Sequence, residues 1–172
     1  MRTYKEIINE HYVAEKKSAL SLIGIAILMM VIAGIIYLTV KAGVTYGIIY
    51  GLLPLSIIQI LAGIFVFIKA NLRQKIIIKK IEGQPNFKIE TELKRTSAEV
   101  KRLRVTRKIQ ETAFVIALFV ICLGMAKLVN PIGMGLAMAL LLQAGVMIAF
   151  DLFAVRRAEE YLRRIHKCAS KN

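Results

Sequence analysis

The chain has 172 residues, of which 25 are Lys or Arg and 11 are Asp or Glu, giving a net charge of +14. Its hydrophobic content is 57% and its mean hydropathy is +0.61, against about 45–50% apolar residues in a typical soluble domain. This composition excludes a disordered chain, which would be poor in apolar residues, and a soluble nucleic-acid-binding domain would explain the charge but not the apolar excess.

Four long apolar stretches follow one another along the sequence, at 19–40, 44–68, 112–129 and 132–154. About 20 apolar residues cross a bilayer as a helix, so the first, second and fourth stretches qualify directly. The third is shorter and could be a buried or re-entrant helix, but the turn signal Asn130-Pro131 pairs it with the fourth. The first is too long for the apolar region of a cleaved signal peptide, which has about 7–15 residues. We therefore predict an all-α integral membrane protein with four transmembrane helices arranged as two hairpins.

The basic residues predict how these helices are oriented. Of the 25 Lys and Arg residues, 23 lie in the N-terminal tail, in the segment 69–111 or after the fourth stretch. Only Lys41 and Lys127 lie on the other side. Because loops rich in Lys and Arg stay in the cytoplasm, both termini and the central segment are expected to be cytoplasmic, in a bacterial inner (plasma) membrane.

The segments outside the membrane also carry helical patterns. Apolar residues fall on single helix faces in four places: Tyr4, Ile7, Ile8 and Tyr12; Leu72, Ile76 and Ile77; Leu93, Val100 and Leu103 with Thr96; and Ala158, Tyr161, Leu162 and Ile165. The breaker Glu82-Gly-Gln-Pro-Asn86 separates the second pattern from the third. We expect four helices, at about 3–40, 45–82, 90–129 and 132–169, whose charged halves project as a basic cytoplasmic bundle. The alternative is that these halves lie flat on the membrane.

The two hairpins, 1–82 and 90–172, are predicted to be an internal repeat joined by a linker at 83–89. An offset of 84 residues aligns Gly51 with Gly135, Gln59 with Gln143 and Arg73 with Arg157 without a gap. Both copies would have the same orientation in the membrane, as in a parallel repeat. Chance similarity between two basic-ended apolar helices is the alternative.

Small residues recur every four positions in the second and fourth stretches. They are Gly43, Gly47 and Gly51, followed by Gly135 and Ala139. Such spacing lets helix backbones approach closely, which predicts helix packing within one subunit or between subunits.

Three polar residues inside the stretches are candidates for structure or for a transport path. Gln59 and Gln143 occupy equivalent repeat positions, and we expect them to face the interior and to hydrogen-bond to each other. Asp151 is the only Asp of the chain. It would form an ion pair with Lys69, Arg156 or Arg157, or else a gate in an oligomer.

Sequence motifs for catalysis, metal binding or cofactor binding are missing. There is no CxxC, HExxH, GxSxG or GxxxxGK[ST] pattern, and the two histidines, His11 and His166, are not at ligand spacing. We predict no catalytic residues, no metal, no cofactor and no enzymatic activity.

Basic residues concentrate in two cytoplasmic regions, and in the run 94–108 seven of 15 residues are basic. Such clusters bind anionic lipid headgroups and could meet RNA phosphates or an acidic protein. The candidate residues for an anionic partner are Lys94, Arg95, Lys101, Arg102, Arg104, Arg107, Lys108, Arg156, Arg157, Arg163 and Arg164.

Two functions fit these features. The first is a non-enzymatic membrane protein that self-associates into a homo-oligomer and forms a channel or pore. The second is an accessory, regulatory or defence and immunity subunit, whose membrane half anchors it and whose basic helices recruit a protein, RNA or anionic-lipid partner.

Overall fold

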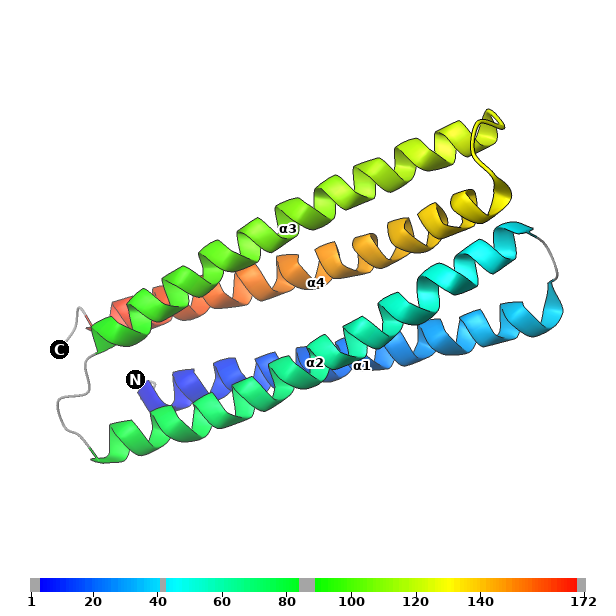
Figure 1. Ribbon diagram of the computed structural model, residues 1–172. Helices are drawn as coiled ribbons and strands as arrows, with labels where there is room; N and C mark the ends of the chain where they lie inside the picture. The colour runs from blue at the N-terminus through cyan, green and yellow to red at the C-terminus, as the bar shows by residue number, and fades with distance from the viewer. Residues whose placement is uncertain (1–3, 41–42, 84–88, 170–172) are drawn as a thin grey trace.

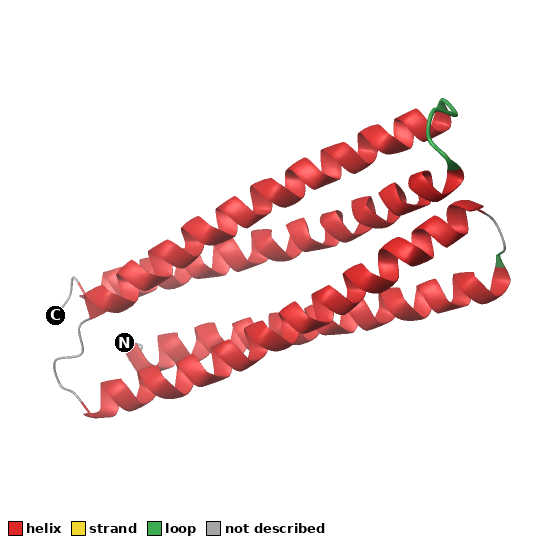
Figure 2. Ribbon diagram, in the orientation of Figure 1, coloured by secondary structure: helices red, strands yellow, loops and turns green. Residues whose placement is uncertain are grey.

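The computed structural model describes residues 4–40, 43–83 and 89–169. These residues form four helices, which are α1 (Tyr4–Thr39), α2 (Gly43–Gly83), α3 (Ile89–Met125) and α4 (Pro131–Ala169). Figure 2 shows that nearly all of the described chain is helical. Each helix contains a segment that is long and apolar enough to cross a membrane. The predicted all-helical class with four such segments is confirmed.

The helices pair as two antiparallel hairpins, α1 with α2 and α3 with α4. The hairpins meet mainly through α2 and α4, and α1 also approaches α4. Within the described ranges, the backbones of α2 and α3 do not approach each other. The starts of α1 and α3 and the ends of α2 and α4 lie at one end of the bundle (Figure 1). The ends of α1 and α3 and the starts of α2 and α4 lie at the other. The predicted hairpin pairing is therefore confirmed.

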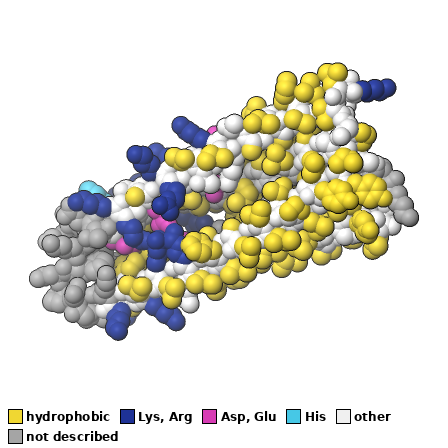
Figure 3. Space-filling model, in the orientation of Figure 1, with side chains coloured by type: hydrophobic (Ala, Val, Ile, Leu, Met, Phe, Trp, Pro, Cys, Tyr) yellow, Lys and Arg dark blue, Asp and Glu magenta, His cyan; other side chains and the backbone are white. Residues whose placement is uncertain are grey.

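The bundle has two chemically different halves. The apolar half comprises residues 19–39, 43–68, 112–125 and 131–150, and the charged half comprises residues 4–18, 69–83, 89–111 and 151–169. Lys and Arg side chains gather over the charged half, whereas hydrophobic side chains cover most of the visible apolar half (Figure 3). The predicted linker at 83–89 lies almost wholly outside the described residues.

Glycines bring α2 and α4 into backbone contact in the apolar half. A Cβ added at Gly47 would overlap the Ile132 carbonyl oxygen and lie 2.9 Å from the Gly135 Cα. One turn along, a Cβ at Gly51 would lie 2.5 Å from the Ala139 Cβ. The small residues predicted for helix packing thus meet inside one chain, because only glycine leaves room for two backbones at this separation.

The turn between α3 and α4 explains why α3 ends at Met125 and not at the predicted residue 129. Lys127 has φ 62° and donates its N–H to the Gly124 carbonyl at 3.0 Å, while the Leu128 N–H reaches the Leu123 carbonyl at 3.0 Å. This bonding pattern closes a helix with one left-handed residue.

The start of α4 is fixed by the residues of the predicted turn. The Asn130 Oδ1 accepts the Gly133 N–H at 2.6 Å, as an N-terminal cap does. Pro131, the first residue of α4, needs no hydrogen-bond partner for its nitrogen at that position.

The charged half has its own hydrophobic core. It contains residues of three helices, namely Ile7, Ile8, Tyr12, Ala70, Ile77, Tyr161 and Ile165. The predicted helix faces on α1, α3 and α4 are largely buried as expected. The face predicted on α2 is wrong in part, because Leu72 and Ile76 are exposed and α2 turns Ala70 and Ile77 toward the core.

Candidate functional site

The two glutamines of the apolar half meet where α1, α2 and α4 come together. The Gln143 Nε2 donates to the Gln59 Oε1, and the Gln59 Nε2 donates to the Leu22 carbonyl at 3.1 Å. Both side chains are buried, with relative exposures of 2% and 6% for Gln59 and Gln143. The predicted hydrogen bond between them is confirmed, and it ties together α1, α2 and α4.

A buried carboxylate organises the charged half. Glu92 on α3 accepts hydrogen bonds from the Arg95 guanidinium and, at 3.5 Å each, from the Tyr12 and Tyr161 hydroxyls. Burial, followed by the Glu92 charge, holds the pKa of both tyrosines well above the usual value. Both hydroxyls therefore remain donors, and the cluster fastens α3 to α1 and α4.

A second carboxylate, Glu99, lies in a ring of cations. It lies 2.8 Å from the Lys69 Nζ, 3.3 Å from Arg73 and 3.7 Å from Arg95. Burial alone would raise the pKa of Glu99, but the Lys69 hydrogen bond and the three cations outweigh burial and lower it. These ion pairs connect α2 with α3, whose backbones do not approach each other.

A cavity of about 210 Å³ lies between these clusters and the apolar half, and all four helices line it. Its polar lining includes His11, Glu15, Ser18, Lys69, Glu99, Arg102, Asp151 and Arg157. Burial and the nearby Glu99 carboxylate raise the pKa of Glu15, although Lys69, Arg73 and Arg157 oppose this rise.

Asp151 does not form the predicted ion pair. Gln110 and Arg107, both on α3, act on its carboxylate, and its Oδ2 has no hydrogen-bond partner among the described residues. No salt bridge from Asp151 to Lys69, Arg156 or Arg157 occurs among the described residues. The prediction used depth along the helix alone, but Asp151 faces α3, and Arg157 donates to the Ala14 carbonyl at 2.9 Å.

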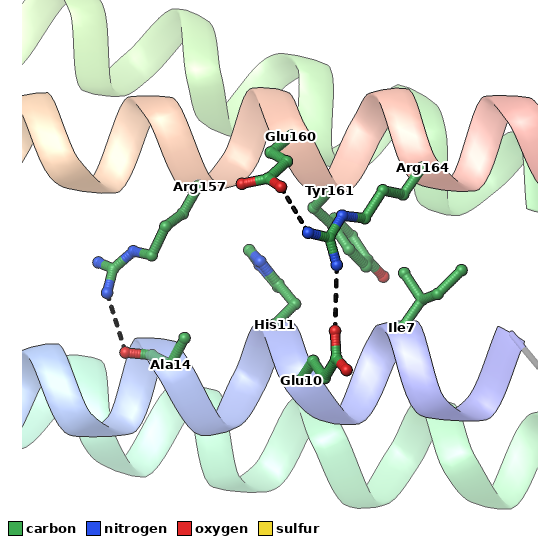
Figure 4. Close-up of a pocket in the computed structure, with 8 residues that line it drawn as sticks. All are labelled: Ile7, Glu10, His11, Ala14, Arg157, Glu160, Tyr161 and Arg164. Atoms are coloured by element: carbon green, nitrogen blue, oxygen red, sulfur yellow. Dashed lines mark hydrogen bonds and ion pairs between the residues drawn. The ribbon is translucent and has the colours of Figure 1, made fainter. Parts of the chain in front are cut away.

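A pocket of about 210 Å³ lies between α1 and α4 (Figure 4). The His11 ring stacks on the Tyr161 ring with centroids 4.1 Å apart. Arg164 bridges Glu160 of its own helix and Glu10 of α1. Burial, followed by the Arg157 charge, lowers the pKa of His11 to about 4, so this imidazole is neutral near pH 7.

Ten of the 11 basic residues predicted to face an anionic partner divide into two groups. Those with partners inside the protein are Arg95, Arg104, Arg107, Arg157 and Arg164. Those that are exposed, with no hydrogen bond or ion pair among the described residues, are Lys101, Arg102, Lys108, Arg156 and Arg163. Lys94 is exposed and has contacts of its own. The second group is available to a partner.

Part of that group lines a groove between α3 and α4. Val100 and Leu162 form its apolar floor, and Lys101, Arg104 and Arg163 stand around it. Glu159 bridges to Arg104 across the groove at 2.6 Å. We call this feature the α3–α4 groove.

The site residues predicted from the sequence do not include Glu92, Glu99, Tyr12, Tyr161 or His11. The Glu92–Arg95 spacing of three residues was the one local signal, because such pairs share a helix face. The partners Tyr12 and Tyr161 are 80 and 69 positions away in sequence.

Among the described residues, no three His, Cys, Asp or Glu side chains gather in a way that would hold a metal ion. No protein-family model, curated protein or solved structure matches the chain.

Proposed function

We propose that this chain is a non-enzymatic membrane protein whose apolar half anchors it and whose charged half is a cytoplasmic docking domain. The support for the membrane placement is the four apolar helices together with the positions of 23 of the 25 Lys and Arg residues at one end of them. The bundle would lie in a bacterial inner membrane with both termini in the cytoplasm.

The observation that carries the docking role is the α3–α4 groove. Its floor of Val100 and Leu162 is apolar, and Lys101 and Arg163 beside it have no partners among the described residues. An amphipathic helix with acidic flanks fits such a surface, because apolar anchors fill the floor and carboxylates meet the cations. The partner we propose is therefore an acidic protein segment, which makes the chain an accessory or regulatory subunit.

Crosslinking in cells tests this role. A photo-crosslinking residue at Ser97, in the groove, should capture one defined protein, and Lys101→Glu with Arg163→Glu should reduce that capture at least fivefold. The matched control is Lys75→Glu with Lys79→Glu, because both lysines are exposed on α2, outside the groove. Equal capture by the two double variants would reject the docking role.

Self-association is a second candidate, favoured by the surroundings of α3. Among the described residues, α4 is the one helix whose backbone approaches α3, and only 6% of the most apolar 18-residue segment of α3 is buried. Val115, Ile116 and Phe119 are all exposed there. A second copy packing on this face would cover them.

A pore in such an oligomer would lie between subunits. Inside one subunit, Gly47 and Gly135 bring the backbones into contact, and Gln59 bonds to Gln143. The proposal predicts a stable oligomer in nanodiscs and ion flux in liposomes that Asp151→Asn alters. A monomer would reject self-association, and an oligomer in ion-tight liposomes would reject the pore alone.

A further inference from the structure

A second basic cavity, separate from the α3–α4 groove, lies where α2 faces α3. Its volume is about 180 Å³, and it is lined by Lys69, Arg73, Arg95, Ala98, Glu99 and Arg102. Four of these side chains are cationic and one is anionic. We call it the α2–α3 cleft.

The positive charges of the cleft exceed what its carboxylate can balance. Lys69, Arg73 and Arg95 share the single Glu99 carboxylate, and Arg95 also binds Glu92. Arg102 is exposed and has no ion pair among the described residues. Figure 3 shows Lys and Arg side chains gathered around a few acidic ones over the space between the two hairpins. The cleft therefore presents an excess of positive charge to an anion.

The position of the cleft along the bundle is that of a lipid headgroup. Lys69 is the first residue after the uncharged stretch 44–68, and Arg73 follows one turn later. With the apolar half in the bilayer, these two cations lie at the polar boundary of the cytoplasmic leaflet.

Apolar strips lead from the cleft into the apolar half on both walls. On α2, Phe65 and Ile58 precede Lys69 by four and eleven residues, which places all three on one face of the helix. On α3, Ile109 and Ile116 follow Arg102 at intervals of seven. These four apolar side chains are all more than half exposed, and the backbones of α2 and α3 remain apart.

We propose that the α2–α3 cleft binds one anionic phospholipid, with its phosphate at Lys69, Arg73 and Arg102 and its acyl chains along the two strips. Basic pockets between membrane helices on the cytoplasmic side are suited to anionic headgroups. A soluble phosphate compound would use the cations but leave the strips uncovered. The inference rests on the membrane placement proposed above, but not on the docking role of the α3–α4 groove.

Native mass spectrometry with defined lipids tests the proposal. Protein in nanodiscs of phosphatidylcholine with a small fraction of phosphatidylglycerol should retain one phosphatidylglycerol after release from the disc. Arg102→Glu should lower that retention at least tenfold, and the neutral Arg102→Gln should lower it several-fold. Melting temperatures of the variants show whether each remains folded.

The matched control is Lys108→Glu, which makes the same charge change at another exposed position of α3, outside the cleft. It should leave the retention within twofold of the original protein. Equal losses in Lys108→Glu and Arg102→Glu would mean diffuse surface attraction and would overturn the proposal, as would equal retention of phosphatidylcholine.

Competition identifies the source of the phosphate. Millimolar inorganic phosphate or glycerol phosphate should not displace the lipid, and displacement would overturn the lipid assignment in favour of a soluble anion. Capture through Ser97 should be unchanged by Arg102→Glu, so a failure of the lipid site and a failure of the docking role would be seen separately.

Discussion

Three buried polar side chains of this bundle, Gln59, Glu92 and Gln143, find partners on other helices. Gln59 on α2 binds Gln143 on α4, and Glu92 on α3 receives hydroxyls from Tyr12 on α1 and Tyr161 on α4. A buried polar group without a partner costs about 1–3 kcal/mol, so each such residue favours one arrangement of the helices over its alternatives. Single substitutions should therefore report on how helices are placed relative to one another.

The glutamine pair gives the clearest test at this scale. Gln59→Met and Gln143→Met should each lower the free energy of unfolding by about 1 kcal/mol, because each leaves the other amide without its partner. In the double variant the losses should fall short of their sum by about 0.6–1.7 kcal/mol, the range for polar contacts between membrane helices. Unfolding titrations in mixed detergent measure all four proteins.

A control cycle pairs Gln143→Met with Thr45→Val. Thr45 is buried near the start of α2, far along the helix from the glutamine pair, so these two effects should add. Coupling of similar size in both cycles would show that it does not come from the amide hydrogen bond.

His11 should make the stability of the charged half depend on pH. Its pKa is lowered from the ordinary 6.5 of histidine to about 4 in the folded protein, because burial and the charge of Arg157 oppose the imidazolium. Arg95 acts in the same direction, and Glu99 opposes it. Between these two pKa values the unfolded chain binds the extra proton, so this contribution to stability is present above pH 6.5 and is lost as the pH falls toward 4.

The expected loss from His11 between pH 7 and pH 5 is about 2 kcal/mol. Thermal unfolding over this range should show it, and His11→Phe, which keeps a ring against Tyr161, should flatten that part of the profile. The control is His166→Phe, since His166 is exposed on α4 and its removal should leave the profile unchanged. An unchanged profile in His11→Phe would assign the pH dependence to groups other than His11.

At the scale of helices, α2 and α4 differ from α3 in how much of their apolar length is buried. α2 and α4 pack against each other through glycines, whereas α3 keeps most of its apolar length exposed. Two glycines of α1 and α2 show how much the surroundings of a glycine can differ. Gly47 has backbone atoms where a Cβ would go, and Gly34 on α1 has nothing within 4 Å of that position.

Alanine substitutions at these two glycines should have opposite effects. Gly47→Ala forces α2 away from α4 and should cost about 1–3 kcal/mol, as overpacking does. Gly34→Ala meets no atom and should stabilise the helix by up to about 1 kcal/mol, because alanine loses less backbone entropy. Melting temperatures of the two variants in one detergent compare them directly. Equal destabilisation would mean that the close approach of α2 and α4 is not required.

Periodicity and glycine spacing predicted the helices well, but they did not predict the cluster of side chains around Glu92. Helices were expected at 3–40, 45–82, 90–129 and 132–169, and three of them match the structure within two residues at each end. The third ends four residues early, because the αL conformation of Lys127 is a property of the turn and not of the apolar pattern. Helix ends depend on such local geometry more than on hydropathy.

Some contacts of the candidate site were likewise predictable from the sequence, and others were not. The Gln59–Gln143 contact followed from the predicted repeat, in which the two residues occupy equivalent positions. Asp151 was assigned wrong partners, because sequence gives depth along a helix but not which neighbour lies on each side. The Glu92 cluster needed three helices to converge, and that convergence is set by packing between distant segments.

For the whole molecule, the division of charge makes a prediction about topology. Lys127 lies at the hairpin-turn end of the bundle and Lys79 lies at the end with the chain termini, with the full apolar half between them. In a chain without its native cysteines, Lys127→Cys should react with a membrane-impermeant maleimide in intact cells. Lys79→Cys should react only after the membrane is opened, because segments rich in Lys and Arg stay in the cytoplasm and 23 of the 25 basic residues lie at this end. Labelling of both from outside would contradict the membrane placement. Labelling of Lys79→Cys alone would invert the topology and would place both the α3–α4 groove and the α2–α3 cleft on the outer side.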